Sequence, residues 1–173
     1  MERNEIALRT GENIVVNPGA NTNKLLECRM NSKKYPRIKN IPQDEALSRM
    51  GAIVLNAFQL KGMTSDPTNI MSIASKVLEY LLADYDGIGS GNISFEEIER
   101  VVERYVMTRG RDMFGVSAST IYPIIEDYIR GEGRILQEKA NELEKKRYDM
   151  ELKKSIIAPM LQSYTGALVK NSR

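Results

Sequence analysis

Several residue types are absent or rare in this chain of 173 residues, which has no histidine, no tryptophan and a single cysteine, Cys28. A disulfide within the chain, a zinc site built on cysteine clusters or histidine, and a triad or dyad that uses imidazole as its base are therefore excluded. The sequence also has no glycine-rich phosphate loop followed by Lys-Ser/Thr. From these absences we predict that the protein is not an enzyme and has no cofactor.

Long apolar runs are also missing. No run approaches the roughly 18 residues needed to cross a bilayer, and the N-terminal residues MERNEIALRTGE are too acidic and polar for a signal peptide. The hydrophobic content of 42% and the charged content of 28% are typical of a globular protein. We expect a cytoplasmic protein with no membrane partner.

The charges are distributed unevenly along the chain. Residues 1–40 have a net charge of +4, residues 41–130 of −5 and residues 131–173 of +3. This division predicts a basic, poorly ordered N-terminal arm, a helical core domain, and a charged helical arm that ends in an apolar tail. Because phosphate binding requires contiguous positive charge, any nucleic-acid contact should be local.

The core domain shows helical periodicity and clear start signals. A first helix should run from Gln43 to Lys61 and be apolar around much of its girth, with Leu60 extending its apolar face. A second should begin with Asp66 as its N-cap and Pro67 as its first residue, and end near Ala83. Its expected buried residues are Ile70, Ile73, Ala74, Val77, Leu78, Leu81 and Leu82.

A third helix follows, in which Ser94 as N-cap and Glu97 three residues later form a capping box. Its expected buried residues are Phe95, Ile98, Val101, Val102, Tyr105 and Val106. With a fourth helix that carries Ile124, Ile125 and Tyr128, these segments predict an all-α fold, a small bundle with a charged, extended C-terminal helix.

The third and fourth helices are joined by a corner, residues 108–114, and this region resembles a helix-turn-helix DNA reader. Gly115 would allow the turn, Val116 would pack beneath it and Ser117 would cap the second helix, with Ile121 and Ile124 as anchors. The candidate DNA-binding residues are Arg104, Arg109, Arg111, Ser117, Ser119 and Thr120.

Two features of the corner depart from the motif. Arg111 stands where a small buried residue is expected, and Pro123 falls where the recognition helix should already be regular. Proline is tolerated only in the first turn of a helix, so the second helix should start nearer Ser119 or Thr120. An ordinary helical corner explains the same residues.

Residues 86–97 resemble the calcium loop of an EF-hand, between two helices. Asp86 would be the first ligand, Ser90 and Asn92 would occupy later ligand positions, and Glu97 would be the bidentate last ligand. Ile88, however, stands where an oxygen ligand belongs, and no second loop is present to pair with this one. A flexible glycine loop followed by the capping box of Ser94 explains the same residues.

The C-terminal arm is strongly charged. It carries one apolar residue per heptad, which is too few for a coiled coil but suits a helix that covers the body on one stripe or binds a partner protein. These apolar residues are Leu136, Leu143, Met150 and Ile157.

Residues 43–150, taken together, resemble small α-helical accessory proteins from the replication modules of phages and mobile elements, some of which are replisome organisers or helicase loaders. The resemblance is carried by the order of the helices, the glycines Gly110 and Gly115, Tyr128 and the charged arm. It implies a non-enzymatic adaptor in a bacterial host cell that touches DNA weakly and binds a helicase or similar protein through its C-terminal arm.

Two other hypotheses remain open. The protein could instead be a structural or assembly protein of a phage or mobile element, whose basic ends order against neighbouring subunits in a homo-oligomer. The second alternative is an EF-hand-like calcium-binding module. The sequence does not distinguish single-stranded from double-stranded DNA.

Overall fold

The structure is a computed structural model, and it describes residues 20–84, 87–110 and 113–170. These residues form helices and loops, with one isolated antiparallel bridge between Arg37 and Ser94. The all-α prediction is confirmed. The elements in chain order are α1 (Ala20–Met30), η1 (Ile38–Asn40), α2 (Gln43–Leu60), α3 (Pro67–Ala83), η2 (Ser90–Asn92), α4 (Phe95–Arg109), α5 (Ala118–Tyr128), η4 (Ile129–Gly133) and α6 (Arg134–Lys170).

Helix α2 packs against both α3 and α4, as expected of a central helix. It begins at Gln43, the predicted residue, and fully buries Met50 and Val54. Leu60 was expected to extend the buried face, but its side chain is 41% exposed. It is the last residue of the helix.

Helix α3 has the predicted start, because the side chain of Asp66 accepts a hydrogen bond from the Asn69 backbone N–H at 2.9 Å, and Pro67 is the first helical residue. The predicted stripe is buried except for Leu82, whose exposed fraction is 47%. Successive residues are about 100° apart around a helix. With Leu81 pointing into the core, Leu82 therefore points outward, and its assignment to the core was wrong.

The connection between α4 and α5 is longer than a helix-turn-helix turn. Residues 110–117 separate the two helices, whereas the motif has a turn of about three or four residues. Helix α5 begins at Ala118, earlier than the predicted start at Ser119 or Thr120. Pro123 lies inside α5, and its ring is exposed at the surface. Because proline has no backbone N–H, the helix lacks one hydrogen bond at this position.

Residues 20–40 fold onto the body, which corrects the expectation that residues 1–40 are a poorly ordered arm. Helix α1 packs against α4 and α6 and buries Leu25 and Cys28, and Ile38 is buried just before α2. Burial also raises the pKa of the Cys28 thiol. Helix α1 has a weak apolar pattern of its own, so contacts with distant helices hold it in place rather than its own periodicity.

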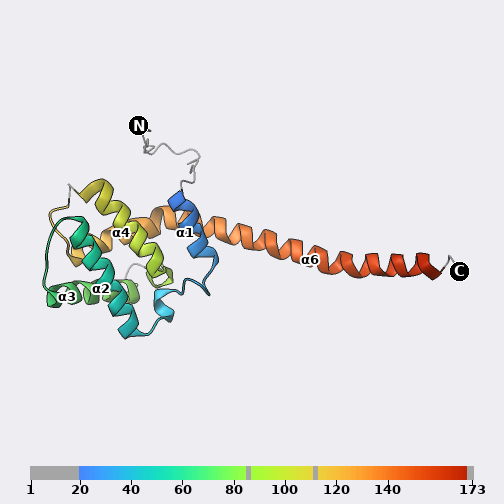
Figure 1. Cartoon of the computed structure of the whole chain (residues 1–173), viewed down its shortest axis with the longest axis horizontal. Coiled ribbons are helices and arrows are strands. Elements are labelled where there is room, and N and C mark those ends of the chain that lie inside the picture. The colour runs from blue at the N-terminus through green and yellow to red at the C-terminus, as the bar shows by residue number, and fades with distance from the viewer. Residues whose placement is uncertain (1–19, 85–86, 111–112, 171–173) are drawn as a thin grey trace.

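Helix α6 leaves the body and extends far from it (Figure 1). Its first turns pack against α1 and bury Leu136 and Ala140. Beyond Ala140, the described side chains are exposed, apart from the half-buried Leu143. The structure therefore consists of a helical body and one long helical arm.

Leu81→Ala and Leu82→Ala are a matched pair that tests the core. Leu81 is fully buried, so its truncation should lower the free energy of unfolding by about 2–5 kcal/mol. Leu82 is half exposed, and its truncation should cost less than about 1 kcal/mol. Urea denaturation of both variants measures the difference; equal costs would contradict the placement of this helix face.

Candidate functional site

The carboxylate of Glu97 is completely buried at the start of α4. Its Oε2 atom accepts hydrogen bonds from the backbone N–H and the hydroxyl of Ser94, both at 3.0 Å. In return, the Glu97 N–H donates to the Ser94 hydroxyl at 3.4 Å. The predicted capping box is confirmed, and it fixes the direction of the Glu97 side chain.

Two arginines and a tyrosine from other parts of the chain surround the same carboxylate. Arg29 of α1 forms an ion pair with Oε1, and Arg37 forms one with Oε2 at 3.1 Å. The hydroxyl of Tyr128, at the end of α5, donates to Oε1 at 3.0 Å. Arg37 also donates to the Arg29 carbonyl at 2.8 Å. This cluster ties α1, the segment before α2, α4 and α5 together.

The tyrosine in this cluster is held in its neutral form. Burial, followed by the nearby negative charge of Glu97, raises the pKa of Tyr128 far above its usual range. A neutral hydroxyl can donate a hydrogen bond to the carboxylate, whereas a negatively charged tyrosinate would repel the carboxylate. Tyr128 is therefore a permanent hydrogen-bond donor in this cluster.

The chain passes this cluster in a π-helical turn, Ile129–Gly133, between α5 and α6. A Cβ atom at Gly133 would lie 2.9 Å from the Tyr128 carbonyl oxygen and 3.1 Å from Arg29 Nη2. Because contacts under 3.0 Å require the backbone to shift, glycine is needed here for the close approach. Single π turns within helices are frequent at functional sites.

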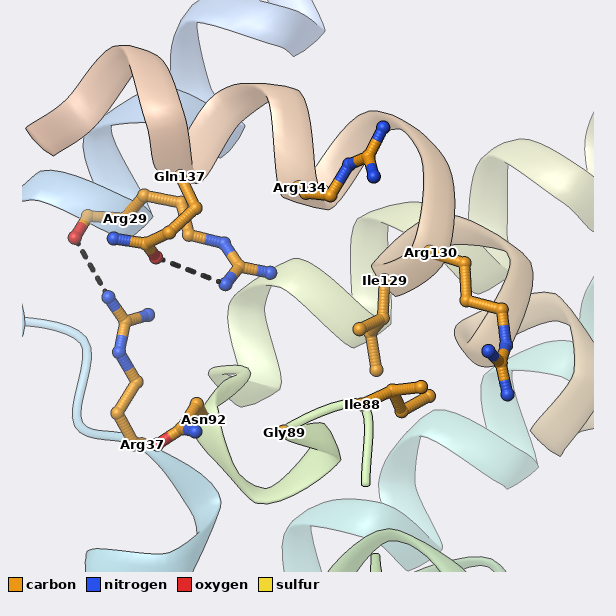
Figure 2. Close-up of a pocket in the computed structure, with 10 residues that line it drawn as sticks. Arg29, Arg37, Ile88, Gly89, Asn92, Ile129, Arg130, Arg134 and Gln137 are labelled. Carbon is orange, nitrogen blue, oxygen red and sulfur yellow. Dashed lines mark hydrogen bonds between the residues drawn. The ribbon is translucent and has the colours of Figure 1, made fainter. Parts of the chain in front are cut away.

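A cleft of about 670 Å³ opens beside the π turn (Figure 2), and we call it the arginine cleft. The close-up shows the Arg29 guanidinium between Gln137 and the pair Ile88 and Ile129, with Arg130 and Arg134 at the edges. The described residues that line it include four arginines and no acidic residue. They are Arg29, Arg37, Ile88, Gly89, Asn92, Ile129, Arg130, Gly133, Arg134 and Gln137.

The predicted DNA-binding arginines differ in their surroundings. Arg104 is paired with Glu132, with Nη2 and Oε2 2.5 Å apart, so its charge is partly neutralised. Arg109 is exposed at the end of α4. Arg111 lies outside the described residues.

Hydrogen bonds at the start of α5 involve the hydroxyl groups of Ser117, Ser119 and Thr120. The Ser117 backbone N–H donates to Thr120 Oγ1 at 2.8 Å, and the Thr120 hydroxyl donates to the Ser117 carbonyl at 2.9 Å. The hydroxyls of Ser117 and Ser119 are 2.9 Å apart, within hydrogen-bond distance. These hydroxyls stabilise the start of α5, where Ser117 is the N-cap residue.

The candidate calcium ligands do not converge within the described residues. Asp86 lies outside them, and both oxygens of Glu97 are engaged by the arginine cluster. The Ser90 hydroxyl donates to the Leu81 carbonyl at 2.6 Å, and Asn92 is exposed. Groups of three or more Asp, Glu, Cys or His side chains that could hold a metal are absent from the described part of the chain.

Asp84 organises this loop instead. Its carboxylate accepts hydrogen bonds from the backbone N–H groups of Gly89 and Ser90, both at 3.1 Å. These hydrogen bonds lower the pKa of Asp84, with the Ser90 N–H as the largest cause. Asp84 therefore closes this loop from within, and Glu97 belongs to the capping box that follows it.

The sequence did not point to the arginine cleft. Arg29 and Arg37 lie in a segment that was expected to be poorly ordered, and Arg130 and Arg134 lie about a hundred residues later. Near Arg130 and Arg134, the glycines Gly131 and Gly133 interrupt the helical pattern, and they are the feature of the sequence that marks this region. Residues so distant in sequence meet only in the folded chain.

Comparisons of this chain with family models, with curated proteins and with solved structures give no match. Within the described ranges, every helix is too short or too polar to cross a membrane. The function is therefore inferred from the geometry and the sequence alone.

Glu97→Ala tests the buried cluster. Removing the carboxylate leaves Arg29 and Arg37 without their shared anion, so the free energy of unfolding should fall by about 3–5 kcal/mol. Glu96→Ala is the matched control, because Glu96 is only partly buried and pairs with Arg49 at the surface. Denaturant unfolding that gives equal losses for both variants would show that the cluster does not stabilise the fold.

Proposed function

We propose that this protein is a non-enzymatic adaptor in a bacterial host cell, in which the α6 arm binds a partner protein and the body makes a local contact with DNA. The observation that carries the proposal is the part of α6 beyond Ala140. At about 1.5 Å per residue, residues 141–170 extend about 45 Å past Ala140, the last buried residue among the described side chains of the helix. A helix of this length offers a large surface for a partner and contributes little to its own body.

The side chains of the arm support a binding role. Tyr148, Met150, Leu152 and Ile157 are large and apolar, and each is roughly half exposed or more. Charged side chains lie between them, as in the ion pair of Lys146 with Glu142 at 2.7 Å. Tyr148 and Leu152 are four residues apart and therefore lie on one side of the helix, whereas Met150 and Ile157, seven apart, lie on another. Each pair suits an apolar groove on a partner protein, where it is removed from water.

The corner supports a contact with single-stranded DNA. Arg109 is exposed and Phe114 is fully accessible there, and the other two phenylalanines of the chain are buried. Single-strand binding surfaces combine positive charge with exposed aromatic rings on which bases stack. The outward side of α5 carries Pro123 and Asp127, which suit a DNA groove poorly.

Lys61 keeps the corner in place. Its ammonium group donates hydrogen bonds to the carbonyl oxygens of Gly110 and of Met113, the latter at 2.9 Å. A cation at the C-terminal end of α4 is favourable because the carbonyl groups there have no partner within the helix. The corner is therefore anchored at its base and leaves Phe114 outside.

The class of partner follows from the resemblance in sequence. Some accessory proteins of phage and mobile-element replication modules are replisome organisers or helicase loaders, and the resemblance implies contacts with DNA and with a helicase or similar protein. An arm for a protein and a separate corner for DNA suit such a link. In this proposal the arm recruits the partner and the corner keeps it near single-stranded DNA.

The assembly alternative uses the two basic ends of the chain, one of which is the end of this arm, and the oligomeric state separates the two proposals. If the protein is an adaptor, light scattering should give the mass of a single chain, because the arm has too few apolar residues for a stable coiled coil. A chain shortened to residues 1–141 is the control and should keep its melting temperature. Oligomers of the full chain that dissociate on this truncation would favour the assembly protein.

Arg109→Ala and Phe114→Ala test the DNA contact. Both should weaken the binding of labelled single-stranded DNA in fluorescence anisotropy, and only the arginine variant should make the dependence on salt less steep, by about 0.7 in the log–log slope. Arg147→Ala, an exposed arginine of the arm, is the charge-matched control and should bind normally. Absence of binding to the full chain at low salt would refute the DNA contact.

A further inference from the structure

The floor of the arginine cleft has an excess of positive charge. The guanidinium groups of Arg29 and Arg37 share one carboxylate, that of Glu97, and the side chains of these arginines are only 7% and 12% exposed. Two cations and one anion leave one positive charge uncompensated in a place that is largely shielded from water. Such a charge interacts strongly with an anion, because the surroundings screen it less than water does.

The arginines at the edge of the cleft add to this field. Arg130 pairs with Glu126 at 2.8 Å, and Arg134 with Glu138 at 4.0 Å. Both pairs join residues four apart on the helix surface, where ion pairs are weak and easily rearranged. Either arginine can therefore turn toward an anion in the cleft without disturbing the core.

The remaining lining residues make the cleft suitable for a small molecule. Its volume of about 670 Å³ lies within the usual range for ligand sites, roughly 300–1,000 Å³. Ile88 and Ile129 form an apolar side next to the Arg29 guanidinium (Figure 2), and the amides of Asn92 and Gln137 can donate or accept hydrogen bonds. The site thus combines a cationic floor with an apolar wall.

We propose that the arginine cleft binds a phosphate group, either free or as part of a nucleotide or a nucleic-acid strand. Guanidinium groups match the oxygens of phosphate with paired hydrogen bonds and are less strongly hydrated than an ammonium group. One negative charge of the phosphate balances the excess positive charge of Arg29 and Arg37 at the floor of the cleft. The apolar wall then accommodates the group to which the phosphate is attached.

This site is separate from the corner and does not depend on the proposed function. Gln137→Glu is the most informative variant, because Gln137 Oε1 accepts a hydrogen bond from Arg29 Nη1 at 3.3 Å. A carboxylate of the same size would supply the missing negative charge beside Arg29. It should therefore keep or raise the melting temperature while it removes phosphate binding.

The experiment is a calorimetric titration of the full chain at low ionic strength with inorganic phosphate, with adenosine monophosphate and with a short single-stranded oligonucleotide. Acetate is the control anion. Gln59→Glu, at an exposed position of α2, is the control for the added charge. We expect phosphate to bind the native chain and Gln59→Glu equally, and at least tenfold more weakly to Gln137→Glu.

The three phosphate probes identify the source of the group. Binding of inorganic phosphate or the nucleotide, lost in Gln137→Glu, supports a small-molecule site, and the same loss for the oligonucleotide alone supports a strand. The proposal is overturned if no probe binds, if acetate binds as well as phosphate, or if Gln137→Glu binds normally. Oligonucleotide binding that depends on Arg109 but not on Gln137 overturns it and leaves the proposed function intact.

Discussion

The ion pairs that Glu97 forms with Arg29 and Arg37 are the interaction on which the rest of this fold depends. A buried carboxylate loses its hydration, and this cost is offset only when several donors replace the water. Here the donors come from Ser94, Tyr128 and the two arginines, which belong to different parts of the chain. Removing α4 would leave both arginines without their anion, and removing α1 or α5 would take a donor from the buried carboxylate, so the cluster makes α1, α4 and α5 depend on one another.

The same cluster creates the arginine cleft. Gly133 allows the π turn to pass close to Tyr128 and Arg29, and the turn leaves an open cleft above the arginines. Two arginines facing one carboxylate stabilise the fold and also leave a positive charge near the surface. Fold stability and anion binding are therefore coupled. A substitution in the cleft that adds negative charge should keep or raise the stability of the fold and weaken anion binding.

The body and the arm have different physical characters. The body is held by a continuous apolar core and by buried polar contacts, whereas α6 beyond Ala140 is supported by its own backbone and by exposed ion pairs. A surface of this kind changes little when a partner binds, because it is already helical. The corner, anchored by Lys61 and carrying the exposed Phe114, lies in another part of the body, so the proposed protein, DNA and phosphate contacts use separate surfaces.

The sequence by itself determined the local structure: the starts of α2, α3 and α4 at Gln43, Pro67 and Phe95, the capping box, most of the core and the charged arm. Capping and periodicity act within a few residues, so they can be read from a short stretch. Only the tertiary structure decided which distant residues meet. The partners of Glu97 and the folding of residues 20–40 onto the body depend on contacts between segments far apart in the chain. Such contacts leave no periodic signal in a single sequence, because their free energy appears only when the helices pack.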